Sequence, residues 1–196
     1  IDVFVSLSDV AEEYGYVKPE FNDNNVIDIV DGRHPIVERN VSADSYISND
    51  CKVDKDNNIL LITGPNTGGK TVTLKVAGLL TIMALSGIPI PANEKTEIGY
   101  FHNVLADIGD EQSLEQNLSS FSGHVSKIKD IIENANSKSL VLMDELGSGT
   151  DPMEGAAFAM AIIDYLNKKH VTSIITTHYS EVKAYAFNTT GIKSAS

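Results

Sequence analysis

The sequence has 196 residues, of which 42% are hydrophobic, so it can bury one good core but is too short for two large domains. Its 15 basic and 27 acidic residues give a net charge of -12, which argues against strong nucleic-acid binding by this chain alone. The single cysteine, Cys51, excludes an internal disulfide framework and a zinc cluster built from several thiols.

Neither a membrane span nor a signal peptide is visible in the sequence. No run of about 18 apolar residues occurs, and the N-terminus lacks a basic segment followed by an apolar one. A cytoplasmic location is therefore the expected default.

The first part of the chain has one helical pattern and few strand patterns. Residues 1–16 place apolar side chains at helical spacing, which predicts an amphipathic helix that packs on the domain. Residues 26–30, VIDIV, predict a short strand, and a Gly-to-Pro break follows it. Residues 41–58 are rich in Asn, Asp and Ser and predict a loop with one short strand.

From Ile59 the pattern changes to apolar strands that alternate with helices. Uniformly apolar strands indicate a sheet covered on both faces, and their alternation with helices indicates parallel strands. The predicted class is therefore α/β, with a largely parallel sheet covered by helices on both faces. The strands are expected at residues 59–63, 140–144 and 172–177, with a further strand beginning near residue 191, and the helices at residues 71–86, 154–167 and 180–186.

Residues 64–71 read GPNTGGKT, which has the spacing of a P-loop: Gly, four residues, Gly, Lys and Thr. The glycines let successive N–H groups turn toward phosphates at the positive end of the following helix dipole. Lys70 is predicted to reach the β- and γ-phosphates of ATP, and the Thr71 hydroxyl is predicted to bind Mg²⁺. The predicted nucleotide-binding residues in this segment are Gly64, Pro65, Asn66, Thr67, Gly68, Gly69, Lys70, Thr71 and Thr73.

Two adjacent carboxylates, Asp144 and Glu145, follow the apolar strand. Asp144 is predicted to hold Mg²⁺ through the water shell that this ion keeps. Glu145 is predicted to orient or deprotonate the attacking water. Two acids side by side at a strand end repel each other unless a cation or a proton transfer uses them. The alternative interpretation is an acidic cap at the end of a strand.

Taken together, these motifs resemble the ATPase domain of the MutS family over nearly the whole chain. The matching segments are GRHPIVE, SYISND, LITGPNTGGKT, LSSFSGH, SLVLMDELGSGT and TTHY. The segments DIGDEQSLEQNLSSFSGH, GTDPMEGAA and HYSEVKAY are similar to the second bacterial branch of the family rather than its mismatch-repair branch. The resemblance implies a P-loop NTPase fold of the ABC/MutS type, with residues 1–24 as a helix and linker from lever arms and residues 25–196 as the ATPase domain, truncated at its C-terminus.

The resemblance also assigns roles to weaker signals. Tyr46 matches an aromatic residue that stacks on adenine, with an ordinary packing role as the alternative. Ser119 and Ser120 match the signature region that each subunit presents to the nucleotide of its partner, with a helix N-cap as the alternative. His178 matches a residue that senses the γ-phosphate and joins the predicted catalytic group, with a structural hydrogen bond as the alternative.

Expectations for the whole protein follow from the same resemblance. The parent protein is expected to be a homodimer with two composite ATP sites. It is expected to bind branched DNA and, through other domains, to suppress homologous recombination, to act on stalled ribosomes and their rRNA, or to do both. An endonuclease domain is expected outside this sequence. The alternatives are a nucleotide-gated binding module whose hydrolysis is incidental, a member of the mismatch-repair branch, and a P-loop kinase.

Overall fold

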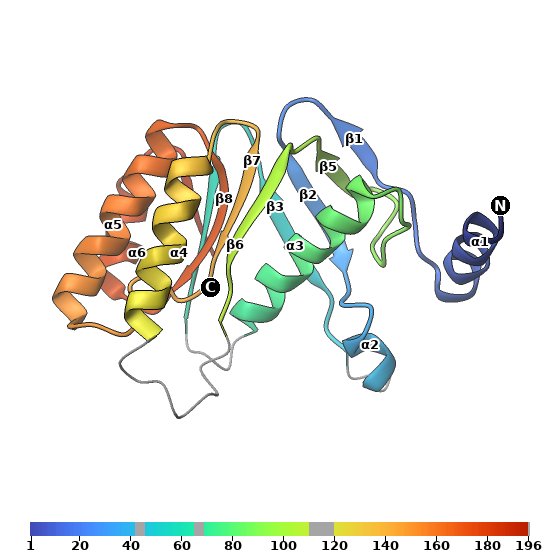
Figure 1. Cartoon of the computed structure of the whole chain (residues 1–196), viewed down its shortest axis with the longest axis horizontal. Coiled ribbons are helices and arrows are strands. Elements are labelled where there is room, and N and C mark those ends of the chain that lie inside the picture. Colours follow the sequence, from blue (N-terminus) through green and yellow to red (C-terminus); the bar gives the residue numbers. More distant parts are fainter. Residues whose placement is uncertain (42–45, 65–68, 110–119, 196) are drawn as a thin grey trace.

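The computed structural model describes residues 1–41, 46–64, 69–109 and 120–195, although not the side chains of residues 120–122. Two sheets enclose a central helix, α3 (Lys70–Leu85), and further helices cover the outer face of the larger sheet (Figure 1). Within the described ranges, none of the helices is both long and apolar enough to span a membrane.

The larger sheet consists of β4 (Ile59–Thr63), β6 (Asn103–Asp107), β7 (Ser139–Met143), β8 (Thr172–Thr177) and β9 (Ile192–Ala195). Its strands lie in the order β6-β7-β8-β4-β9, and every neighbouring pair is parallel. All residues of β4, β7 and β8 are buried, which is the pattern expected of parallel strands covered on both faces. The predicted α/β fold with a parallel sheet is therefore confirmed, and so is a strand beyond residue 191.

Helices cover both faces of this sheet. Successive side chains of each strand point to opposite faces, so one strand contributes to two cores. The outer helices are α4 (Ser120–Asn134), α5 (Pro152–Lys168) and α6 (Ser180–Phe187). Leu60 and Ile62 of β4 belong to the core that contains α3, whereas Ile59 and Leu61 belong to the core under the outer helices. Because α3 lies between two sheets, its buried residues are not confined to one stripe.

The smaller sheet packs against α3 from the other side. It consists of β1 (Glu20–Asn22), β2 (Ile27–Gly32), β3 (Asn49–Val53) and β5 (Glu97–Gly99) in the order β1-β5-β2-β3. The strand β2 is antiparallel to both of its neighbours. The sequence predicted β2 and the strand within residues 41–58, but it did not predict β1, β5 or β6. The first two strands have three residues each, and β6 is mostly half-buried, so their patterns are weak.

The predicted N-terminal helix is α1 (Asp2–Tyr14), which ends at Gly15 in the left-handed conformation, with φ of 63°. None of its residues is buried. Half-buried Leu7 and Val10 line a groove of about 400 Å³ together with Met83 of α3. The helix therefore packs on the domain along one edge only. A second short helix, α2 (Val37–Asn40), follows β2 and borders the same groove.

Candidate nucleotide-binding site

The predicted site residues lie at the carboxyl ends of strands in the larger sheet, where parallel strands end together. Thr63, the last residue of β4, pairs with Thr177 of β8, and Gly64 follows directly. Past the end of β7, the Asp144 N–H donates to the carbonyl oxygen of Asp107, the last residue of β6, at 2.9 Å. The strand register therefore brings the glycine bend and the carboxylates to one edge of the sheet.

The described part of the glycine bend joins β4 to α3. Gly64 (φ 143°) and Gly69 (φ 77°) both have backbone conformations that residues with a side chain rarely adopt. Lys70 is 4% exposed, and its Nζ donates to the Gly64 carbonyl oxygen at 2.6 Å. The ammonium group therefore lies against the first residue of the bend, at the N-terminus of α3. The predicted residues Pro65, Asn66, Thr67 and Gly68 lie outside the described residues.

The first turn of α3 is bonded to the smaller sheet. The Thr73 hydroxyl lies 2.7 Å from Asn49 Oδ1, at the start of β3, and 3.2 Å from the Gly69 carbonyl oxygen. Thr71 is half-buried in the same turn. These contacts fix the N-terminus of α3 in place, and the predicted roles of the two threonines stay predictions.

A threonine on the middle strand joins the two acidic residues. Thr176 Oγ1 donates to Asp144 Oδ1 at 2.6 Å and accepts from the Glu145 N–H at 2.8 Å. Asp144 is 5% exposed. Glu145 has φ of 49°, a conformation that costs about 1–3 kcal/mol for a residue other than glycine. Thr176 was not among the predicted site residues, although a hydroxyl at the end of a buried strand was the available signal.

Close backbone contacts hold the turn that follows Glu145. Gly147 has φ of 90°, and a side chain at Gly155 would clash with the Gly147 carbonyl oxygen. The Tyr179 hydroxyl donates to that same oxygen at 2.9 Å. Burial, and then the negative charges of Asp151 and Glu145, raise the pKa of Tyr179 and keep its hydroxyl protonated as a donor. The turn is thereby fixed to the start of α5.

Two further predicted ligand contacts are His178 and Ser120. His178 follows β8 directly, and its ring centroid lies 4.3 Å from that of Tyr179. The histidine is exposed, and its sensor role stays a prediction. Ser120 begins α4, and Ser119 lies outside the described residues.

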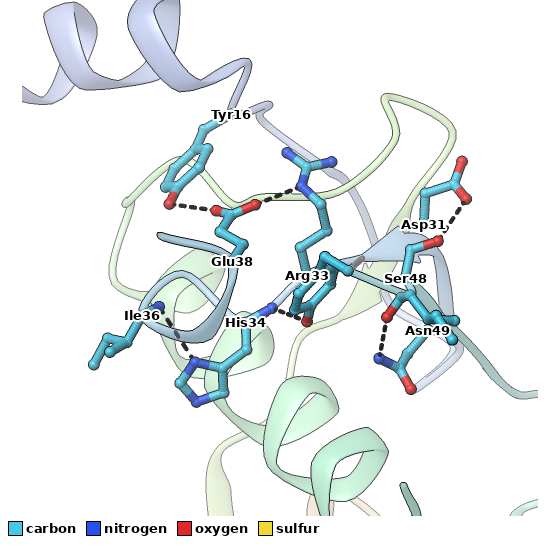
Figure 2. A network of polar contacts seen from close by, with 10 residues as sticks. Tyr16, Asp31, Arg33, His34, Ile36, Glu38, Ser48 and Asn49 are labelled. Atoms are coloured by element: carbon cyan, nitrogen blue, oxygen red, sulfur yellow. Dashed lines mark hydrogen bonds and ion pairs between the residues drawn. The ribbon is translucent and has the colours of Figure 1, made fainter. Parts of the chain in front are cut away.

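The predicted adenine contact, Tyr46, belongs to a polar network near α2, part of which is shown in Figure 2. The Tyr46 hydroxyl accepts from the His34 N–H at 2.7 Å. Glu38 accepts from the Tyr16 hydroxyl at 2.9 Å and from Arg33 Nε at 2.7 Å (Figure 2). Burial, followed by the hydrogen bond to Glu38, raises the pKa of Tyr16 to about 12. The stacking of Tyr46 on adenine stays a prediction.

The oxygen groups at the sheet edge fit a magnesium ion. Asp144 and Thr71 offer a carboxylate and a hydroxyl, and Mg²⁺ is usually held by one or two such groups together with substrate phosphates and waters. The described residues contain no group of three or more His, Cys, Asp or Glu side chains that could enclose a metal on its own. Asp144 and Thr71 would leave the other positions around such an ion to phosphates and waters.

A parallel sheet with a glycine bend between β4 and α3, a buried lysine after the bend and paired acids at a nearby strand end define a P-loop NTPase. The chain belongs to the MutS family, because residues 60–196 match the family model described as MutS domain V, the P-loop ATPase domain of this family.

Curated relatives confirm the predicted second branch of the family. Endonuclease MutS2 of Fusobacterium nucleatum is 56% identical over 196 residues, which is 100% of this chain and 25% of that protein. Endonuclease MutS2 of Clostridium botulinum (Type A) is 50% identical over 196 residues, 100% of this chain and 24% of that protein. Endonuclease MutS2 of Clostridium kluyveri is 54% identical over 178 residues, 91% of this chain and 22% of that protein. The chain thus spans about a quarter of the length of these relatives.

Proposed function

We propose that this chain binds ATP together with Mg²⁺ and hydrolyses it, as the ATPase domain of a larger protein of the MutS2 type. The observation that carries the proposal is the location of Lys70, Asp144 and Glu145 at one edge of the larger sheet, where Thr176 Oγ1 bonds to the Asp144 carboxylate and to the Glu145 N–H. Membership of the family's domain V supports the same function.

In this proposal each group acts on a different part of the reaction. Lys70 and the N–H groups at the start of α3 stabilise negative charge on the phosphate oxygens. Thr71 and Asp144 would hold Mg²⁺, which supplies charge neutralisation on the β- and γ-phosphates when bound. Glu145, whose backbone is fixed by Thr176, orients the attacking water and accepts its proton. His178 contacts the γ-phosphate.

The proposal includes a homodimer in which Ser120, at the start of α4, and the preceding residue in the sequence, Ser119, contact the ATP of the other subunit. ATP would then favour the closed dimer because the γ-phosphate contacts both subunits, and hydrolysis would remove that preference. The relatives are named endonucleases, and we extend that activity to the whole protein through a segment outside this chain. Binding of branched DNA, suppression of recombination and action on stalled ribosomes are the proposed biological roles.

Calorimetric titration with ATP and Mg²⁺ tests the binding step. The wild-type chain should show saturable binding, and Lys70→Ala should weaken it at least tenfold, because a charge-assisted bond of about 1.5–3 kcal/mol is lost. The matched control is Lys168→Ala, since this lysine is the last residue of α5 and its side chain is 75% exposed. Chelation of magnesium with EDTA should stop hydrolysis. A wild-type chain that shows neither heat nor stabilisation with ATP and Mg²⁺ would refute the proposal.

The composite site is tested by the dependence of turnover on protein concentration. If two subunits complete each site, ATP turnover per molecule should rise with concentration until the dimer is saturated. Turnover that is already maximal in the dilute monomer would contradict the shared site and leave ATP hydrolysis within one chain.

A further inference from the structure

Asp107, at the carboxyl end of β6, is a buried carboxylate that the proposed mechanism does not use. Its side chain is 3% exposed, and its Oδ2 lies 2.7 Å from His124 Nδ1. Carboxylate oxygens accept hydrogen bonds, and we assign Nδ1 of His124 as the donor in this contact. The second oxygen, Oδ1, is buried without a hydrogen-bond partner among the described residues, and Lys127 Nζ lies 3.6 Å from it. The bond from His124 is therefore the stronger of these two contacts.

His124 and Lys127 lie on one face of α4 because they are three residues apart. Among the side chains described in this helix, the first that is buried and apolar is Ile128, which is 4% exposed, and Ile131 follows at 5%. Residues 123–127 are exposed or half-buried. Among residues 123–127, His124 and Lys127 therefore attach the helix to the sheet through the Asp107 carboxylate.

The imidazole of His124 lies close to the backbone that follows β6. A Cβ added to Gly109 would lie 3.3 Å from His124 Cε1 and 3.6 Å from Nε2, so the ring lies close to the backbone of that glycine. The carbonyl oxygen of Asp107 also accepts the N–H of Asp144 at 2.9 Å. One residue of β6 therefore contacts both the start of α4 and the backbone of the proposed magnesium ligand.

We propose that His124 is a positioning residue whose bond to Asp107 fixes the direction of the N-terminal turns of α4 at the carboxyl edge of the sheet. This inference rests on the proposed function, in which the start of α4 contacts the ATP of the partner subunit. A helix N-terminus stabilises a phosphate only when its N–H groups point at it, and a displacement of about 1 Å can cost roughly a hundredfold in rate. His124 itself touches no substrate and acts through the orientation of α4.

Three substitutions in the full chain separate this role from simple packing. The amide nitrogen of Asn can take the place of His Nδ1, whereas that of Gln takes the place of Nε2. His124→Ala and His124→Gln should lower kcat about tenfold, because the bond to a buried carboxylate is lost. His124→Asn should keep kcat within about threefold of wild type, because its amide nitrogen can still donate to the Asp107 carboxylate. The affinity of a subunit for ATP and Mg²⁺ should stay within about twofold in all three variants, since Lys70 and Asp144 are unchanged.

A mixed dimer tests whether His124 serves the site of the other subunit. One subunit carries Glu145→Gln and the other carries His124→Ala, and the pair is co-purified through two different tags. One composite site then contains both changes, whereas the other contains an intact Glu145 and an intact His124. The mixed dimer should recover about half of the wild-type turnover, while each homodimer of a single variant stays impaired.

The outcomes distinguish this inference from the proposed function. An active wild-type protein whose Asn and Gln variants at position 124 turn over ATP equally would overturn the positioning role alone. A mixed dimer that does not recover ATP turnover would overturn the inference that His124 acts on the ATP site of the partner subunit. A wild-type protein that does not hydrolyse ATP would overturn the proposed function and this inference with it. If thermal unfolding shows that His124→Ala does not fold, the comparison of Asn with Gln decides the question.

Discussion

The two sheets of this domain differ in where their charged side chains lie. In the described part of the chain, the charged side chains that are buried are Lys70, Asp107 and Asp144, and all three lie at the carboxyl edge of the larger sheet. The interior side of the smaller sheet is apolar, and burial there raises the pKa of the Cys51 thiol to about 12, which keeps it neutral. The ion pair between Lys52 and Asp28 of the smaller sheet lies on the outer surface. One sheet supplies packing, and the edge of the other carries the buried charged residues.

This contrast has an energetic side. Burying a charge costs several kcal/mol unless it is paired, and the left-handed backbone of Glu145 adds about 1–3 kcal/mol. The apolar cores on both sides of the larger sheet must offset these costs. We therefore expect substitutions at the carboxyl edge to change chemistry more than stability, and substitutions in the smaller sheet to do the reverse.

The largest expected effect is on hydrolysis, at the carboxyl edge. Glu145→Gln should lower ATP turnover by roughly 10²–10⁴-fold, because the amide cannot accept the proton of the attacking water. ATP binding should persist, since the substitution keeps the size of the side chain. Single-turnover hydrolysis and equilibrium binding, measured on the same sample, check both statements. Unaltered turnover in this variant would remove Glu145 from the mechanism and favour another base.

The converse effect is expected in the smaller sheet. Ile29 of β2 is fully buried, and Ile29→Ala should lower the free energy of unfolding by about 2–5 kcal/mol through the cavity that it leaves. The affinity of the remaining folded molecules for ATP should not change. The control is Ile82→Ala, the same chemical change at a residue that is 50% exposed. Urea unfolding gives the stability, and a variant that stays stable but loses ATP binding would break the contrast between the sheets.

Thr176→Val tests a residue that contributes to both properties. The valine keeps the shape of the side chain but removes the partner of Asp144 Oδ1 and of the Glu145 N–H, at a cost of about 1–3 kcal/mol in stability. Turnover should also fall, because both acidic residues lose a fixed position. Thr172→Val is the control at the opposite end of β8, where the hydroxyl donates to the Asn25 carbonyl oxygen. If the two variants retain equal turnover, Thr176 only stabilises the fold.

Sequence patterns predicted the larger sheet well because its central strands are buried on both faces and therefore apolar throughout. They missed β1 and β5 because three-residue strands have too few positions to show a period. Local motifs also predicted that Lys70 and Glu145 belong to one site, since each motif sits at a strand end. The contacts of Thr176 and His124 could not be predicted in this way, because their partners are 32 and 17 residues away and only the folded register brings them together.

The smallest expected effect is a pH dependence of stability that arises from Tyr16, on the side of the smaller sheet. Its pKa is raised from 10.0 to about 12, first by burial and then by the hydrogen bond to Glu38. Below pH 10 the phenol is protonated in both the folded and the unfolded chain, so its contribution to stability is complete. As the pH rises from 10 to about 12, the unfolded chain loses this proton more readily, and stability must fall.

Tyr16→Phe should remove this part of the loss while leaving ATP turnover unchanged, because Tyr16 bonds only to Glu38 in the network of Figure 2 and not to the carboxyl edge. Tyr179 and Tyr185 also have raised pKa values, so the wild-type slope contains their contributions as well. The difference between the two proteins in urea unfolding across this pH range isolates Tyr16. Parallel pH profiles would show that the bond to Glu38 does not hold the phenol proton, and a loss of turnover would show that the two sides of the domain are coupled after all.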